Sequence, residues 1–342
     1  MQKLISFCVP SYNSEAYMEK CIDSLLVGGD RVEIIIVNDG SKDNTGAIAD
    51  SYKERYPDIV KVVHKENGGH GSGVNAGIRE ATGIYYKVVD SDDWADEEGL
   101  ITLLDTIEKH LNEGTSPDTY FVNYIFEHVE DNTTYLANYH RQFPRDKFFT
   151  WKDIKDFNVD EYLMMHAIVY KLSVVKESNL VLPEKTFYVD NLFTFVPMFY
   201  VKTMYYLDIT FYHYFIGRQD QSVNINNMVK RYDQQLRVML CMSTAFTMED
   251  LNKLDRPHRK YMLHDLEAKS FLTIFYVMAD YNKQKIADYK EYFKAFKAHD
   301  KKLYRKIRFG TLFFFPFLLP RPLRKAAALF GYKQVCKKTR WG

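Results

Sequence analysis

Blocks of apolar and polar residues alternate along the first hundred positions of the chain. Four short apolar runs, rich in β-branched and aromatic residues, are typical of buried strands: 4–10, 32–38, 59–64 and 84–89. Three segments between them have helical character: 14–26, which we expect Ser14 to cap, 43–56 and 71–81. This alternation predicts a parallel sheet with right-handed crossovers.

The pattern changes along the rest of the chain. Segments with strand character return between 118 and 215, and from about 225 onward the pattern is helical. We therefore expect an α/β domain over 1–220, divided into 1–95 and 96–220, and a helical C-terminal region over 221–342. A length of 342 residues is sufficient for one large domain with such an appended region.

Polar or glycine-rich turns follow the four predicted strands, at 10–13, 38–41, 66–69 and 90–93. The carboxyl ends of parallel strands lie at one edge of a sheet, where open α/β sheets bind their ligands. The turns therefore predict a single binding crevice, in which the glycines leave room for a diphosphate.

Three carboxylates, Asp90, Asp92 and Asp93, come directly after the fourth predicted strand. Like charges this close repel one another, and a buried carboxylate without a partner is costly. A divalent cation would remove the repulsion, and oxygen ligands suit Mg²⁺ or Mn²⁺. The alternative is a solvated acidic loop, but Asp39 in a neighbouring turn adds another acid and favours a ligand site.

Four sequence blocks, in order and spacing across 4–94, resemble the nucleotide-sugar-dependent glycosyltransferases of family 2: "VPSYNSEAYMEKCIDSLL", "EIIIVNDGSKDNT", "KENGGHGSGVNAGIREATG" and "DSDDW". The resemblance implies the GT-A fold, a Rossmann-like, mostly parallel sheet with helices on both faces. It also implies that 1–95 bind the nucleotide and 96–220 the acceptor, in an enzyme of bacterial envelope or exopolysaccharide synthesis.

The resemblance further implies roles for individual residues on the donor side. A UDP-sugar would be contacted by Pro10, Tyr12, Asp39, Asn67, Asp90 and Ser91. Tyr12 would lie against the base, and Asp39 would read a uracil-type edge. Asp92 would bind Mn²⁺ or Mg²⁺ directly, while Asp93 would lie behind the ligands.

Two later segments resemble the family more weakly. Asp190 in "FYVDNLF" is implied to deprotonate the acceptor hydroxyl, and Arg218 in "GRQDQSVN" to steady the leaving diphosphate. A single base on the acceptor side implies direct displacement with inversion, onto a glycan or lipid-linked acceptor. The chain departs from the family at Val74, usually an arginine that His70 could replace, and at Val189, usually a second acid.

Several alternatives remain open at the level of sequence. Asp190 would instead be a helix N-cap, and His166 is expected to be a packed core histidine or to line the acceptor pocket. The segment "GSGVNA" at 71–76 matches a dinucleotide-binding fingerprint, typical of an NAD(P)-dependent oxidoreductase, although it does not start where a strand ends. A nucleotidyltransferase, or a non-catalytic sugar or membrane-surface binder that keeps the fold, is a further alternative.

Charge is distributed unevenly along the chain. The formal net charge is +1, but 301–342 carry twelve basic residues and no acid, whereas 1–300 carry −11 from 34 basic and 45 acidic residues. Basic clusters alternating with Phe and Leu predict contact with an anionic membrane surface, with packing on the protein as the alternative. Nucleic acid is not an expected partner, because the aromatic residues do not interleave with the basic ones.

Four separated cysteines and no long apolar run predict a cytoplasmic protein, peripheral at the inner face of the membrane if 301–342 bind it.

Overall fold

The computed structural model describes residues 2–128, 132–158, 161–217, 225–278 and 282–310, with 319, 320, 323, 326, 327 and 330. They form two compact units. The first contains Met1–Lys155 and Leu163–Ile216, and the second contains Asp156–Tyr162 and Gly217–Gly342. The nucleotide-binding role of 1–95 and the acceptor-binding role of 96–220 stay predictions.

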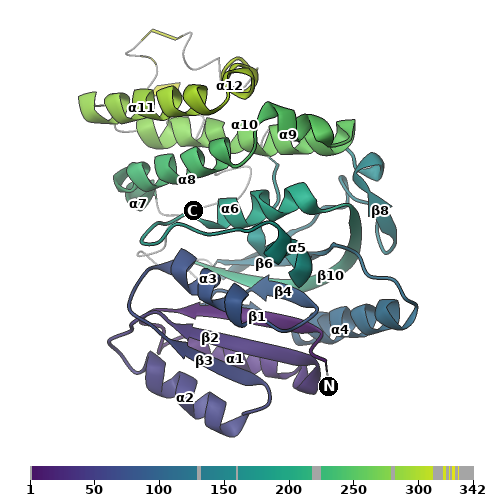
Figure 1. Cartoon of the computed structure of the whole chain (residues 1–342). Coiled ribbons are helices and arrows are strands. Elements are labelled where there is room, and N and C mark those ends of the chain that lie inside the picture. The colour runs from purple at the N-terminus through teal and green to yellow at the C-terminus, as the bar shows by residue number, and fades with distance from the viewer. Residues whose placement is uncertain are drawn as a thin grey trace. The chain divides into compact units, whose positions relative to one another are not determined.

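The first unit contains a single sheet, to which the described residues contribute ten strands (Figure 1). Their order is β3-β2-β1-β4-β9-β6-β10-β5, with β7 beside β6 and β8 beside β10. The strands are β1 Ile5–Ser11, β2 Val32–Asn38, β3 Val60–His64, β4 Tyr85–Val88, β5 Trp94–Ala95, β6 Thr119–His128, β7 Thr133–Ala137, β8 Phe148–Thr150, β9 Ile168–Lys171 and β10 Thr203–Ile216.

The first four long strands, β1 to β4, run parallel, as the alternation of strands and helices predicts. Beyond them the sheet is mixed, because β9 runs antiparallel between β4 and β6, while β6 and β10 are parallel. β5 pairs antiparallel with β10 through Trp94 and His213. This pairing brings the chain just after the 90–93 turn against a strand more than a hundred residues away in sequence.

Helices pack on the strands of this sheet, and Figure 1 shows α3 in front of β1 and β2 and α1 behind them. The apolar side of each helix covers strands whose residues are almost all buried, as in β1 and β2. The helices of the unit are α1 Met18–Leu26, α2 Thr45–Arg55, α3 His70–Glu80, α4 Glu97–Asn112, α5 Leu172–Glu177 and α6 Asp190–Phe195, with short 3₁₀ turns η1 Gly29–Arg31, η2 Trp151–Asp153, η3 Met165–Ala167 and η4 Pro197–Tyr200.

The start of α1 differs from the prediction that Ser14 caps it. The residue before the helix is Tyr17, and it makes no side-chain capping bond. Ser14 instead begins a turn in which its carbonyl accepts hydrogen bonds from the backbone N–H groups of Tyr17 and Met18. Its hydroxyl lies 2.8 Å from the hydroxyl of Ser91, so it ties this turn to the acidic 90–93 turn.

The second unit is helical, as predicted for the C-terminal region. Its described helices are α7 Ile225–Lys230, α8 Tyr232–Ala245, α9 Met248–Lys253, α10 Arg256–Met278, α11 Lys283–His299 and α12 Lys301–Arg308. α8 packs against both α10 and α11, and α12 packs against α11. Among the described residues, no helix combines the length and the apolar character that crossing a bilayer requires.

Candidate active site

The acidic turn 90–93 is held against β10 by the side chain of Tyr212. The Tyr212 hydroxyl donates to Asp93 Oδ2 at 2.6 Å and accepts from the backbone N–H of Asp90 at 3.1 Å. Asp93 Oδ1 accepts from the backbone N–H of Phe215 at 2.9 Å. Asp93 is 1% exposed, whereas Asp90 and Asp92 are half-buried. The turn is therefore an ordered part of the sheet edge, which is not what the alternative of a solvated loop predicts.

Burial and mutual repulsion act on these carboxylates in different ways. Burial, with the charges of Asp92 and Asp90, raises the pKa of Asp93 well above its usual range. Burial also opposes ionisation of Asp90, but the charge and hydrogen bond of His70 outweigh it and lower the pKa of Asp90. The turn thus concentrates negative charge that the protein compensates only in part, which is the electrostatic condition for binding a cation.

His70, the first residue of α3, is the ion-pair partner of Asp90, with its Nε2 2.8 Å from Asp90 Oδ1. Burial alone would lower the pKa of His70, but the carboxylate of Asp90 raises it, with smaller contributions from Asp190 and Asp92. These carboxylates therefore favour the protonated form of an imidazole that lies among three of the predicted site residues. Val74, where the family usually has an arginine, is fully buried and adds no charge here.

His166, on η3, is the second histidine at the acidic turn. It is 5% exposed, as expected for a core histidine, yet one ligand atom each from His166, Asp90 and Asp93 lie within 4.8 Å of one another. Burial lowers the pKa of His166 to about 4, which leaves its imidazole neutral at pH 7. The structure thus places His166 beside the acids.

Lys87, in β4, is a buried cation close to the same acids. Its side chain is fully buried and its Nζ donates to the carbonyl oxygens of His166 and Ile168, at 2.6 and 3.2 Å. Burial lowers the pKa of Lys87 to about 7, although the charge of Asp90 opposes this. Sequence reasoning missed this residue, and the available signal was a lysine at the centre of the apolar strand "YYKVV".

Asp39, at the end of β2, is buried and organises the neighbouring 66–69 turn. Its Oδ1 pairs with Lys65 Nζ at 2.6 Å and accepts from the backbone N–H of Gly68, while its Oδ2 accepts from that of Gly69. The side-chain amide of Asn67 donates to the Asp39 carbonyl at 3.0 Å. Asp39 thus fixes two adjacent strand-end turns, and its predicted contact with a base stays a prediction.

The other predicted nucleotide contacts lie at the same edge of the sheet. Pro10 is buried beneath α3, where a side chain at Gly73 would approach it to 3.0 Å. Tyr12 is 48% exposed and its ring is therefore accessible to a ligand. Ser91 is buried next to Ser14. The roles of these residues towards a nucleotide remain predictions.

Asp190 is the first residue of α6, and the residue that precedes this helix is Val189. The alternative that Asp190 is a helix N-cap is therefore wrong. The loop before α6 is fastened to the 66–69 turn, whose Gly68 carbonyl accepts from the Lys185 N–H, and to α3, whose Ser72 hydroxyl donates to Glu184 Oε1 at 3.0 Å. Val189 is buried, and its apolar side chain supplies no second acid at this position. Arg218 lies outside the described residues.

Comparison with known proteins identifies the family. Residues 6–172 match the model of glycosyl transferase family 2. The chain contains a family 2 glycosyltransferase domain. EpsH of Bacillus subtilis, assigned as a glycosyltransferase, is 28% identical over 265 residues, covering 73% of this chain and 71% of EpsH. Two further curated relatives, 42% and 40% identical over 111 residues, are matched over only 32% and 36% of their own length.

Solved structures show the same fold in other glycosyltransferases. TarS 1–349 of S. aureus superposes with a TM-score of 0.66 at 18% identity, over 98% of this chain and 91% of TarS, and that protein has also been solved with UDP-GlcNAc. A mannosyltransferase of Pyrobaculum calidifontis, solved with GDP-Man and Mn²⁺, gives a TM-score of 0.52 at 14% identity, over 100% of this chain and 84% of that one. The fold is GT-A, as the sequence predicts.

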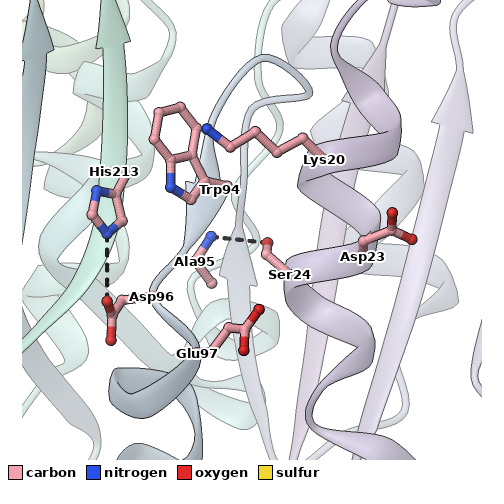
Figure 2. Close-up of a pocket in the computed structure, with 8 residues that line it drawn as sticks. All are labelled: Lys20, Asp23, Ser24, Trp94, Ala95, Asp96, Glu97 and His213. Carbon is pink, nitrogen blue, oxygen red and sulfur yellow. Dashed lines mark hydrogen bonds and ion pairs between the residues drawn. The ribbon is translucent and has the colours of Figure 1, made fainter.

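A pocket of about 590 Å³ in this glycosyltransferase lies apart from the predicted site residues (Figure 2). It opens between α1 and the start of α4, next to the Trp94 ring. Lys20 Nζ lies 2.9 Å from the centroid of that ring, and the imidazole of His213 stacks on it at 5.2 Å. None of the predicted site residues lines this pocket. The pocket therefore gives no reason to move the candidate active site away from the acidic turn.

Proposed function

We propose that this glycosyltransferase transfers a sugar from a UDP-sugar to a hydroxyl of a glycan or lipid-linked acceptor, in a metal-dependent reaction that inverts the anomeric centre. The observation that carries the proposal is the ordered acidic turn 90–93 at the end of β4. Asp39 and its turn lie at the same sheet edge, and the loop bearing Asp190 is fastened to α3 beside it. Three strand ends and one loop thus supply the donor and acceptor sides of one crevice.

The residues of the turn fit a divalent cation. Carboxylate oxygens are the ligands that Mg²⁺ and Mn²⁺ prefer. Burial and the charges of Asp92 and Asp90 raise the pKa of Asp93, and a divalent cation would offset the repulsion between these carboxylates. Asp92, half-buried and next to Asp93, is the proposed direct ligand. When bound, the cation would neutralise the diphosphate leaving group. The mannosyltransferase with the same fold, solved with GDP-Man and Mn²⁺, supports this assignment.

On the acceptor side, Asp190 would accept the proton of the attacking hydroxyl. A base aligned with the acceptor oxygen makes that oxygen a better nucleophile as it forms the bond to the anomeric carbon. Attack from the side opposite the leaving UDP inverts the configuration. His70, whose pKa is raised by Asp90, would stabilise negative charge on the donor side when it is protonated.

On the nucleotide side, Tyr12 offers an exposed ring for stacking, and the Asp39 turn offers backbone groups near the base. UDP is the proposed nucleotide because TarS, which shares the fold, was solved with UDP-GlcNAc. The oxidoreductase alternative loses support, because β3 ends at His64 and "GSGVNA" lies inside α3, away from the strand end that a dinucleotide fingerprint requires.

Release of UDP from a panel of UDP-sugars, measured with and without Mn²⁺, tests the proposal. We expect turnover that excess EDTA removes and that Asp92→Ala abolishes while circular dichroism stays unchanged. Asp105→Ala, which removes an exposed carboxylate of α4, is the matched control and should keep full activity. Full activity of Asp92→Ala, or turnover that survives EDTA, would contradict the metal assignment. Absence of any UDP release would favour the non-catalytic sugar binder.

We also propose that the basic segment 301–342 contacts an anionic membrane surface from the cytoplasmic side, where a lipid-linked acceptor would be presented. Four of the five basic side chains of α12 are exposed, and Arg308 is half-buried; the exposed ones are Lys301, Lys302, Arg305 and Lys306. Leu303 and Ile307, on the apolar side of α12, are buried in the protein. α12 would therefore bind the membrane surface through its charges. Phe309, just after the helix and 62% exposed, would add an apolar contact with the membrane. Residues 311–318, the Phe-rich run, lie outside the described residues.

A further inference from the structure

His166 lies where a metal ligand would, although no sequence motif designates it. One of its ring nitrogens and one carboxylate oxygen each from Asp90 and Asp93 lie within 4.8 Å of one another. His166 comes from η3, more than seventy residues along the chain from the acidic turn. In the sequence, only carboxylates lie near one another in this turn. The fold adds an imidazole nitrogen to them.

The imidazole of His166 also lacks a hydrogen-bond partner. Its Nδ1 is buried and makes no hydrogen bond with any described residue, although the side chain is 5% exposed. A buried polar atom without a partner costs about 1–3 kcal/mol, so most such atoms in proteins bind something. A neutral imidazole offers a lone pair on the nitrogen that carries no proton, and this lone pair is what a metal ion binds.

The surrounding residues hold His166 in place. Lys87 Nζ fixes the backbone of η3 through the His166 carbonyl, and the ring of Tyr214 stacks on the imidazole at 4.3 Å between centroids. The acids are held as well, Asp93 by Tyr212 and Asp90 by His70. Ligands of catalytic metals are usually oriented by such outer partners, which fix the geometry of the site.

We propose that the divalent cation required by the proposed function is bound by His166 through an imidazole nitrogen, together with carboxylates of the 90–93 turn. This inference rests on the metal dependence in that function and adds a nitrogen ligand to it. Imidazole suits Mn²⁺ better than Mg²⁺, whose protein ligands are mainly oxygen. The site should therefore select Mn²⁺ over Mg²⁺ more strongly than a site of carboxylates alone.

Pulsed electron paramagnetic resonance of the full chain with Mn²⁺ and UDP tests the ligand directly, without any turnover. We expect a ¹⁴N coupling to Mn²⁺ in the wild-type protein and its loss in His166→Asn. The Kd for Mn²⁺, measured by calorimetry, should rise at least about 10- to 100-fold in that variant, since even an outer-shell partner contributes this much. The Kd for Mg²⁺ should rise less.

Two variants serve as controls. His70→Gln removes the other imidazole at Asp90, and should keep the ¹⁴N coupling. His110→Asn removes a buried histidine that pairs with Tyr120 and is not part of the acidic group, and should leave both the coupling and the Kd unchanged. If His166→Asn does not fold, the other two spectra still test the ligand. A ¹⁴N coupling that is present in the wild-type protein and kept in His70→Gln would support His166.

Three results would overturn the inference. Bound Mn²⁺ without ¹⁴N coupling would show an all-oxygen site and leave the proposed transferase intact. Loss of the coupling in His70→Gln would move the ligand to His70. Absence of Mn²⁺ binding would remove both this inference and the metal dependence, while UDP release in EDTA would still identify a transferase.

Discussion

At the scale of single residues, the site depends on buried polar groups that compensate one another. Lys87 lies inside a strand where an uncompensated charge would be strongly destabilising, and two carbonyl groups satisfy its ammonium. Asp93 is equally buried, and Tyr212 with the Phe215 N–H satisfies its oxygens. The same contacts that make these groups tolerable also fix the acidic turn relative to β10 and η3. A substitution that removes one of these contacts should therefore both destabilise the fold and displace the acidic turn of the candidate site.

Asp190→Asn tests the proposed base. The amide keeps the shape of the side chain but cannot take a proton, so kcat should fall by about 10²- to 10⁴-fold. The affinity for UDP, measured by calorimetry, should stay nearly unchanged. Glu184→Gln is the control, because it alters the other carboxylate of the same loop, which Ser72 already engages. A decrease in kcat of less than tenfold would assign Asp190 a structural role.

Lys87→Met tests whether the buried lysine positions the metal site. Methionine fills a similar volume but leaves the carbonyls of His166 and Ile168 unpaired, so η3 should lose its fixed geometry and the Kd for Mn²⁺ should rise. Tyr85→Phe is the matched control. It lies in the same strand as Lys87, and it removes the hydrogen bond that the Tyr85 hydroxyl donates to the Pro117 carbonyl. Both variants should lower the free energy of unfolding by about 1–3 kcal/mol. Equal Mn²⁺ affinity in the two variants would show that Lys87 only stabilises the fold.

At the scale of elements, α3 carries His70 to the site because it packs closely on β1. This approach requires Gly77, where a Cβ would come within 2.8 Å of the Cys8 Cβ and 2.9 Å of the Tyr86 hydroxyl. The loop 182–185 packs on the same N-terminal half of the helix that carries His70, and there the side chain of Asn75 pairs with the backbone of Leu182. α3 thus links the strand ends proposed to bind the nucleotide with the loop that precedes Asp190.

Gly77→Ala should destabilise the protein even though alanine favours helices. Overpacking a filled core costs about 1–3 kcal/mol, more than the roughly 1 kcal/mol that alanine contributes to helix propensity. Urea denaturation measures the free energy of unfolding. Arg79→Ala, at an exposed position of α3, should change it by no more than about 0.5 kcal/mol. A Gly77→Ala variant as stable as the wild type would show that α3 can move away from β1.

At the scale of the whole molecule, charge differs between the two ends of the chain, with −11 over 1–300 and twelve basic residues but no acid after Asp300. Screening limits the repulsion between an anionic membrane and the acidic residues to about 8–10 Å at physiological salt. A basic segment that reaches the surface would therefore attract the protein in spite of the overall balance. In α12 the arrangement of residues supports this, because Leu303 and Ile307 are buried and four of its five basic residues are exposed.

Reversing the charge of α12 tests the membrane contact in the full-length chain. With Lys301, Lys302, Arg305 and Lys306 changed to Glu, co-sedimentation with phosphatidylserine vesicles at low salt should be lost, since each basic residue contributes about 1 kcal/mol. The control changes four exposed lysines of the first unit to Glu: Lys42, Lys53, Lys109 and Lys152. Equal pelleting of the two variants, or no pelleting of the wild type, would contradict the membrane contact.

The sequence by itself determined the local elements and the sheet edge at which the polar turns gather, where we propose that ligands bind. Apolar periodicity located β1 to β4 and the helices between them to within a few residues, because strand and helix periods are local properties of the chain. The prediction failed at Ser14, where a turn replaces the first turn of the expected helix. The polar turns followed from the same pattern, since parallel strands present their carboxyl ends together.

The tertiary structure alone decided which distant residues meet at the acidic turn. β9 runs antiparallel between β4 and β6, and β10 pairs with the short strand after Asp93. This topology brings His166 and Tyr212 to a turn that lies 73 to 122 positions away in sequence. No local period encodes such an approach, because strand order depends on how the whole sheet closes around its core. The sequence therefore shows the acids of this glycosyltransferase, and only the fold shows the groups that hold them.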